Sequence, residues 1–73
     1  MSTHPDRWIE MQFDGTDALR IELNRRGHLW HGSASRLVSR SAVERGPLAT
    51  VIGADFEAVR HQVIRTAHHA LKH

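Results

Sequence analysis

The chain contains no cysteine, and this absence excludes several kinds of chemistry at once. Disulfides, thiolate nucleophiles and cysteine-based zinc or iron–sulfur sites are all ruled out. Small secreted domains commonly depend on disulfides, so their absence favours a reducing compartment. The sequence also lacks any apolar run long enough to span a bilayer, and its first residues do not resemble a signal peptide. We therefore expect a cytoplasmic protein with no membrane association.

The short length leaves little room for an enclosed site, because the chain has 73 residues. A chain of this size buries only about 60% of the surface that its unfolded form exposes, which allows one modest core. Its composition, 40% hydrophobic and 25% charged, is that of a globular domain rather than a disordered segment. We expect a single domain over residues 1–73, with residues 1–6 flexible.

Motifs for catalysis are also missing. The sequence has no nucleophile elbow, phosphate-cradling glycine loop or paired-carboxylate motif. Two histidine pairs have spacings that can chelate a metal, His28/His31 and His69/His73. The first pair would lie on opposite faces of a strand and the second at a fraying chain end, and neither has the further ligands that a zinc site needs. We expect no enzymatic activity, no cofactor, no metal site and no small-molecule substrate.

Two segments near the start alternate apolar and polar residues with the period of a β-strand. Their apolar positions are Ile9, Met11 and Phe13 in the first, and Leu19, Ile21 and Leu23 in the second. Turn-forming residues 14–17 lie between them and predict a hairpin. If both apolar sets face the core, the loop must be odd: three residues when Phe13 faces Asp17, or five when it faces Leu19. Trp8 would then lie on the face opposite the first set.

A third strand is predicted over residues 28–31, after a turn at residues 24–27. A three-residue loop ending at Gly27 would turn Leu29 and His31 inward. A loop that differs by one residue would bury Trp30 instead. The larger apolar area of Trp30 favours its burial, but the pattern leaves both arrangements open.

Residues 33–46 give the weakest local signals. Residues 36–40 are a candidate strand, and residues 41–44 are a candidate capping box that would open one helical turn. The β-branched residues in 48–52 then predict a buried strand.

The last segment gives the clearest signal, a helix over residues 55–72. Asp55 suits the N-cap position, and Glu57 suits the first turn. Apolar residues recur at helical spacing at Phe56, Val59, Val63, Ala67, Ala70 and Leu71. The predicted fold class is α+β: a small antiparallel sheet of three to five strands with one C-terminal amphipathic helix packed on one face.

Charged residues are unevenly distributed along the chain. Residues 1–24 carry a net charge of −3, whereas residues 25–73 carry +5. The outer helix face forms a basic stripe of His61, Arg65, His68 and Lys72. Such a stripe suits phosphate contacts, and it is equally typical of a solvated helix face with basic residues near its C-terminal end. The central segment adds further candidate contacts beside Trp8 and Trp30, namely Arg25, Arg26, Arg36 and Arg40.

These observations lead to two hypotheses of different class. The first is a non-enzymatic interaction module that binds a protein partner or a second copy of itself, using aromatic and charged residues such as Trp8. The alternative is nucleic-acid binding through the Arg-rich central segment and the basic helix stripe. A continuous basic face would favour nucleic acid, whereas scattered charge would favour protein.

Overall fold

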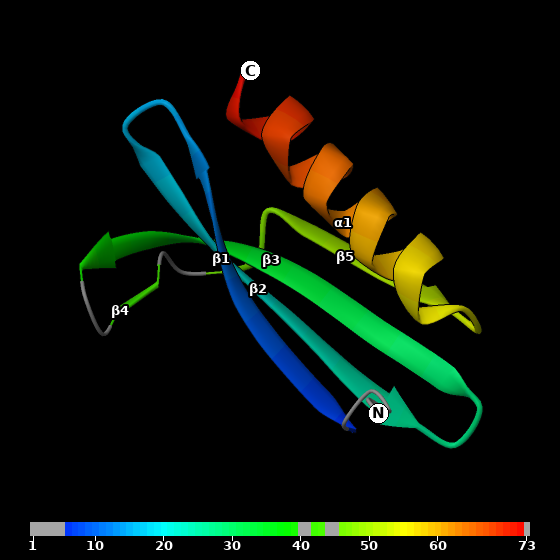
Figure 1. The fold of residues 1–73 in the computed structure, drawn as a ribbon. Helices are drawn as coiled ribbons and strands as arrows, with labels where there is room; N and C mark the ends of the chain where they lie inside the picture. Colours follow the sequence, from blue (N-terminus) through cyan, green and yellow to red (C-terminus); the bar gives the residue numbers. More distant parts are fainter. Residues whose placement is uncertain (1–5, 40–41, 44–45, 73) are drawn as a thin grey trace.

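The chain folds into an antiparallel sheet with one helix lying across one of its faces (Figure 1). The computed structural model describes residues 6–39, 42–43 and 46–72. In chain order the elements are β1 (Arg7–Asp14), β2 (Asp17–Arg26), β3 (Leu29–Ser39), β4 (Ala42–Val43), β5 (Ala49–Gly53) and α1 (Phe56–Leu71). Strands β1, β2 and β3 form a meander, and β3 pairs on its other side with β5 and with the short β4. The predicted fold class is confirmed.

The hairpin of β1 and β2 has a different register from the one predicted. Asp14 pairs with Asp17, so the loop contains two residues, and Gly15 at its first position has a φ of 63°. A positive φ at this position suits a tight hairpin turn, and glycine adopts it without steric cost. An even loop places the two apolar sets on opposite faces of the sheet. The prediction that both sets face one core is therefore wrong.

The hairpin of β2 and β3 resolves the alternative that the sequence left open. Arg26 pairs with Leu29 across a second two-residue loop that begins at Gly27. This register turns Trp30 toward the helix and Leu29 away from it. Trp30 is 6% exposed and Leu29 is 42% exposed. The larger side chain is the buried one, as its apolar area favours.

The middle of the chain is more extended than predicted. The candidate strand at residues 36–40 is the continuation of β3, which reaches Ser39. Ala42 and Val43 pair with β3 as a strand, so the predicted helical turn at these two residues is wrong. Ser41 and Glu44, which would have closed the capping box, lie outside the described residues. Strand β5 confirms the predicted strand, but its β-branched residues are not buried: Thr50 and Ile52 are exposed and Val51 is half-buried. The prediction that this strand is buried is therefore wrong.

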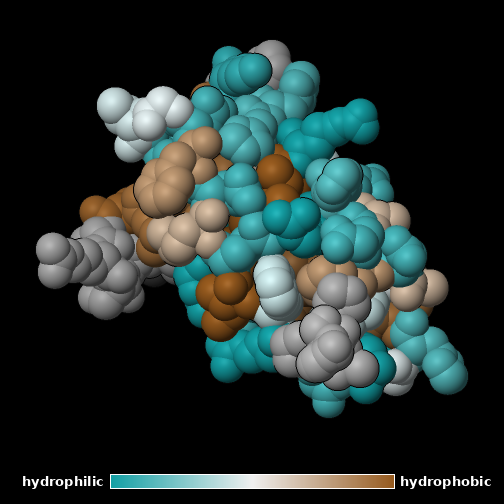
Figure 2. Space-filling model, in the orientation of Figure 1, coloured by the Kyte–Doolittle hydropathy of each residue, from teal (hydrophilic) through white to brown (hydrophobic). Residues whose placement is uncertain are grey.

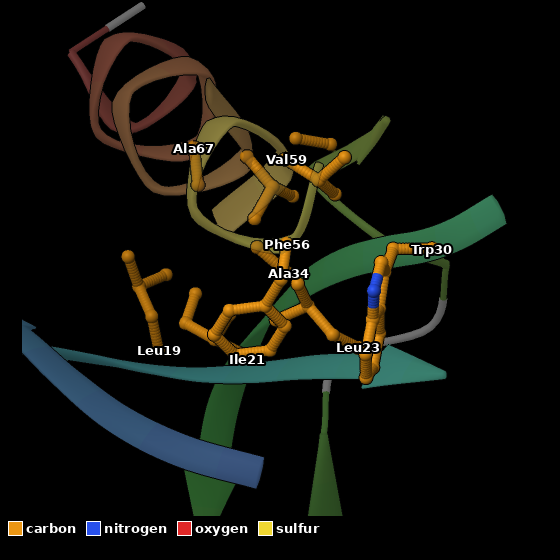
Figure 3. Packing of buried hydrophobic residues seen from close by; sticks show 10 residues of the cluster. Leu19, Ile21, Leu23, Trp30, Ala34, Phe56, Val59 and Ala67 are labelled. Carbon is orange, nitrogen blue, oxygen red and sulfur yellow. The ribbon is translucent and has the colours of Figure 1, made fainter. Parts of the chain in front are cut away.

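The core lies between α1 and the face of the sheet that the helix covers (Figure 3). Three leucine and isoleucine side chains of β2 are fully buried there, and Phe56 packs edge-on against Trp30 with ring centroids 4.8 Å apart. Three buried alanines, Ala34, Ala49 and Ala67, let the helix approach the sheet closely. The buried apolar residues are Leu19, Ile21, Leu23, Trp30, Ala34, Ala49, Phe56, Val59, Val63 and Ala67.

The helix begins and ends almost where the sequence predicts. Asp55 is the N-cap, and its Oδ2 accepts a hydrogen bond from the backbone N–H of Ala58 at 2.8 Å. Lys72 is the C-cap. Four of the six predicted inward positions are buried, and Ala70 and Leu71 are half-buried. Among the described residues, no helix is long and apolar enough to cross a membrane.

Candidate protein interface

The Arg-rich candidates lie in different places. Arg25 and Arg26 end β2 beside the turn to β3, and both are exposed. Arg25 forms an ion pair with Asp6 at 2.7 Å. Arg36 is half-buried in β3, and Arg40 lies outside the described residues.

The helix stripe faces a groove between α1 and β1. His61, Arg65 and His68 line this groove together with Gln12. His61 and Arg65 are exposed, whereas the Nδ1 of His68 lies 2.9 Å from the Oδ2 of Asp14. The fourth stripe residue, Lys72, is exposed at the C-cap. The spacing in the sequence therefore predicts the helix stripe, but it does not predict the contact between His68 and Asp14.

A glutamate of β1 forms the central contact of this side of the sheet. Arg60 donates to both carboxylate oxygens of Glu10, at 2.5 and 2.9 Å. Trp8 Nε1 and Gln12 Nε2 donate to the same carboxylate at 2.8 and 2.7 Å. Hydrogen bonding from the Arg60 guanidinium lowers the pKa of Glu10 to about 2. This network fixes the polar face of β1 toward the helix.

The position of Trp8 follows from the same orientation of β1. It lies on the helix side of β1, is half-buried, and packs edge-on against Phe56 with ring centroids 5.7 Å apart. It is therefore covered by the helix and engaged with Glu10. This arrangement does not make Trp8 an exposed contact residue.

Because the β1–β2 loop has two residues, the apolar residues of β1 form an exposed row on the face of the sheet away from the helix. Ile9, Met11 and Phe13 are 46%, 44% and 70% exposed, and all three point away from the helix. We call these three side chains the β1 stripe, and the face of the sheet away from α1 the open face. Figure 2 shows apolar surface running along β1 toward its turn with β2. The sequence pattern marked these residues as apolar but assigned them to the core.

The neighbouring strand shows why the β1 stripe is an edge feature. The residues of β2 that share the open face include Arg20, Glu22 and Asn24. Glu22 accepts hydrogen bonds from Arg7, Arg20 and Asn24 at 3.0, 3.0 and 3.2 Å. The part of the open face next to β1 is thus polar and internally paired, so the β1 stripe forms an apolar row along one edge of the sheet, apart from the exposed Leu29 and Ile52 on β3 and β5.

The backbone of β1 is unpaired on that same edge. The backbone N–H of Arg25 donates to the carbonyl of Asp6 at 2.7 Å, so Asp6 directs its carbonyl toward β2. Antiparallel pairing alternates along a strand, so the even-numbered residues of β1 pair with β2 and the odd-numbered residues point outward. In the described part of the chain, no other strand pairs with β1. The residues of the β1 stripe therefore present both their side chains and their backbone groups to a partner.

The candidate metal ligands of the sequence lie apart from one another in the described residues. Among residues 6–39, 42–43 and 46–72, no three histidine, aspartate or glutamate side chains converge on one metal position. His31 lies in β3 and His28 in the turn before it, and His73 is outside the described residues.

Comparisons with protein-family models, with curated proteins and with solved structures find no match for this chain.

Proposed function

We propose that this protein is a small interaction module that binds a polypeptide along β1. The observation that carries the proposal is that one edge strand presents both an exposed apolar row and an unpaired row of backbone groups. An apolar row alone would suit any nonpolar surface. Free N–H and C=O groups on the same residues suit an extended strand, which adds to the sheet through main-chain hydrogen bonds and places alternate side chains beside the row.

The energetic scale is adequate for a specific contact. Burying a large apolar side chain fully contributes about 1.5–3 kcal/mol. The three side chains of the β1 stripe are roughly half exposed, so covering them would contribute roughly 3 kcal/mol in addition to the hydrogen bonds. Natural proteins usually protect exposed edge strands with charges, proline or bulges. Between Ile9 and Phe13, the charged residue of β1 is Glu10, which turns toward the helix and is held by Arg60, so the open-face side of this segment carries no charge, proline or bulge.

The charge distribution supports a protein partner over nucleic acid. Several arginines are engaged by carboxylates: Arg7 and Arg20 by Glu22, and Arg60 by Glu10. Both tryptophans lie on the helix side, half-buried or buried, which leaves neither ring free to stack on a base. The arginines on and beside β1 and β2 are thus interleaved with acids, which favours a protein-binding surface over a phosphate-binding face on this side of the molecule.

A photo-cross-linking experiment in cells tests the proposal. The photoreactive amino acid p-benzoylphenylalanine replaces Phe13 in one variant and Ile52 in a matched control. Ile52 is also apolar, lies on the open face, and is 60% exposed, but it belongs to β5. We expect adducts at position 13 that are digested by protease and resist nuclease, and few adducts at position 52.

A second substitution separates specific capture from random capture. Met11→Lys, made together with the photoreactive residue at position 13, introduces a charge that opposes edge pairing. Met11 is outside the core, so the fold should persist, which circular dichroism can verify. The adducts should then disappear. Equal labelling at positions 13 and 52, nuclease-sensitive adducts, or adducts unaffected by Met11→Lys would each contradict the proposal.

A further inference from the structure

Resting on the proposed function, we infer that the polypeptide bound along β1 is the β1 strand of a second copy of this chain, paired antiparallel about a two-fold axis at Met11. The two sheets then form one continuous sheet across the dimer. An interface of this symmetry requires a surface that is complementary to itself. The β1 edge meets that requirement in its hydrogen bonding and its apolar side chains, and it does so in a register that brings no two carboxylates opposite each other.

The hydrogen-bonding pattern is self-complementary. The outward-facing residues of β1 are the odd-numbered ones, as the contact of Asp6 with Arg25 establishes. An antiparallel partner must also offer residues with both backbone groups turned to the edge. With Met11 on the axis, Met11 pairs with the partner's Met11, and Ile9 pairs with the partner's Phe13. Each such pair exchanges both N–H···O=C bonds.

Side-chain packing favours the same register. On the open face, the two copies of the β1 stripe meet as one apolar cluster. Sliding the partner so that Ile9 lies on the axis would leave Phe13 unpaired, although it is the most exposed of the three at 70%. The register centred on Met11 pairs all members of the stripe.

Charge on the helix side excludes the other near registers. With Glu10 on the axis, it would lie directly opposite the partner's Glu10. With Gln12 on the axis, Glu10 would lie opposite the partner's Asp14. Like charges directly opposite each other are destabilising in a sheet. With Met11 on the axis, Glu10 faces the partner's Gln12 and Trp8 faces the partner's Asp14, so no carboxylates oppose each other.

The same symmetry sets the positions of the two helices. A two-fold axis between antiparallel edge strands is perpendicular to the sheet, so both copies of α1 lie on the same face of the continuous sheet. Helix α1 covers β5, β3 and part of β2, and its contacts with β1 are two polar pairs on the helix side of the strand and the packing of Phe56 on Trp8. The second sheet can therefore approach the β1 edge without displacing either helix.

The absence of cysteine makes cross-linking a clean test. Sedimentation of the purified chain should first show a concentration-dependent dimer. In Met11→Cys, the paired Cα atoms lie about 5.5 Å apart, within the span of roughly 4.4–6.8 Å that a disulfide bridges. In Ile9→Cys or Phe13→Cys, the equivalent atoms of the two copies lie about 14 Å apart along the strands. Met11→Cys should cross-link on mild oxidation, or with a short thiol reagent, and the other two should not.

Mixing the two control variants tests the register directly. Ile9→Cys and Phe13→Cys should each stay uncross-linked alone and should cross-link to each other when mixed. Cross-linking of either variant alone, as fast as Met11→Cys, would overturn the register. A chain that stays monomeric at millimolar concentration would overturn self-association. Photo-adducts at position 13 with another protein would then still leave the proposed function in place.

A proline substitution tests the backbone contribution. Met11→Pro removes an N–H that points away from β2, so it should leave the β1–β2 ladder intact. Gln12→Pro removes an N–H that pairs with β2 and should destabilise the fold. Because a symmetric dimer loses the Met11 bond twice, Met11→Pro should weaken dimerisation about tenfold relative to Met11→Ala, with an unchanged circular dichroism spectrum. Equal dimerisation by Met11→Pro and Met11→Ala would overturn edge pairing.

Discussion

Replacing Gly32 with alanine tests how closely the helix approaches the sheet. Gly32 is buried in β3 beneath α1. A Cβ atom built at this position would lie 2.9 Å from the Cγ1 of Val59 and 3.6 Å from side-chain atoms of Leu23 and Val63. A Cβ atom at Gly53, on the neighbouring β5, would lie 2.9 Å from the Cγ2 of Val59. The two methyl groups of Val59 thus rest over two glycines, and neither position has space for a side chain.

The expected effect of Gly32→Ala is a moderate loss of stability. Overpacking a core by one methyl group costs about 1–3 kcal/mol. Replacing glycine restricts the unfolded chain and offsets about 0.4–1 kcal/mol of that loss. A net loss of about 1–2 kcal/mol would lower the Tm of a domain of this size by roughly 5–15 °C. The substitution acts through this contact alone, because the backbone of Gly32 has an ordinary conformation.

Urea unfolding followed by circular dichroism measures the effect, with Val59→Ala as the second arm. Val59→Ala removes both crowded methyl groups, so Gly32→Ala in that background should cost less than about 0.5 kcal/mol. Ser33→Ala is a matched control, since Ser33 is the next residue of β3 and faces the other side of the sheet. An unchanged or higher stability for Gly32→Ala, or the same loss in both backgrounds, would refute this account of the packing.

Three further predictions concern the core, the helix cap and acid stability. Ile21 is fully buried, so Ile21→Asp should lower the free energy of unfolding by several kcal/mol, visible as a collapsed thermal melt. Asp55→Ala should cost about 1 kcal/mol in urea unfolding and speed amide exchange at Ala58, whose N–H loses its partner. Because Arg60 lowers the pKa of Glu10 from 4.5 to about 2, ionised Glu10 stabilises the fold fully above pH 4.5. That contribution is lost as the pH falls toward 2, and Arg60→Gln should flatten this acid-dependent loss in melts between those values.

Local patterns predicted those elements whose signal lies within a few residues. The helix was found because its apolar spacing, its N-cap at Asp55 and its length all agree. Strand β2 and its inward side chains were found by simple alternation. Trp30 was favoured for the core because of its size, and the two-residue turn at Gly27 decides its orientation.

The apolar pattern of β1 alone does not show which face of the strand packs against the helix. Alternation shows that Ile9, Met11 and Phe13 share a face, but not which face packs against the helix. The two-residue turn at Gly15, and not the apolar pattern, determines which face of β1 packs against the helix. The partner of Glu10 was equally hidden, because Arg60 lies fifty residues away along the chain.

The orientation of β1 is held by specific contacts, and this bears on its function. Turning the strand over would bury the β1 stripe, but it would also separate Glu10 from Arg60 and Asp14 from His68, and it would expose the Trp8 ring that packs on Phe56. Hydrogen bonds to charged groups contribute about 1.5–3 kcal/mol each, so the two bonds from Arg60 to Glu10, together with the packing of Trp8 on Phe56, offset the partial burial of three edge side chains. An isolated chain therefore keeps its apolar row outward in a fixed geometry. A row that is both apolar and rigidly presented is preorganised for association, because little ordering remains to oppose the binding of a second strand.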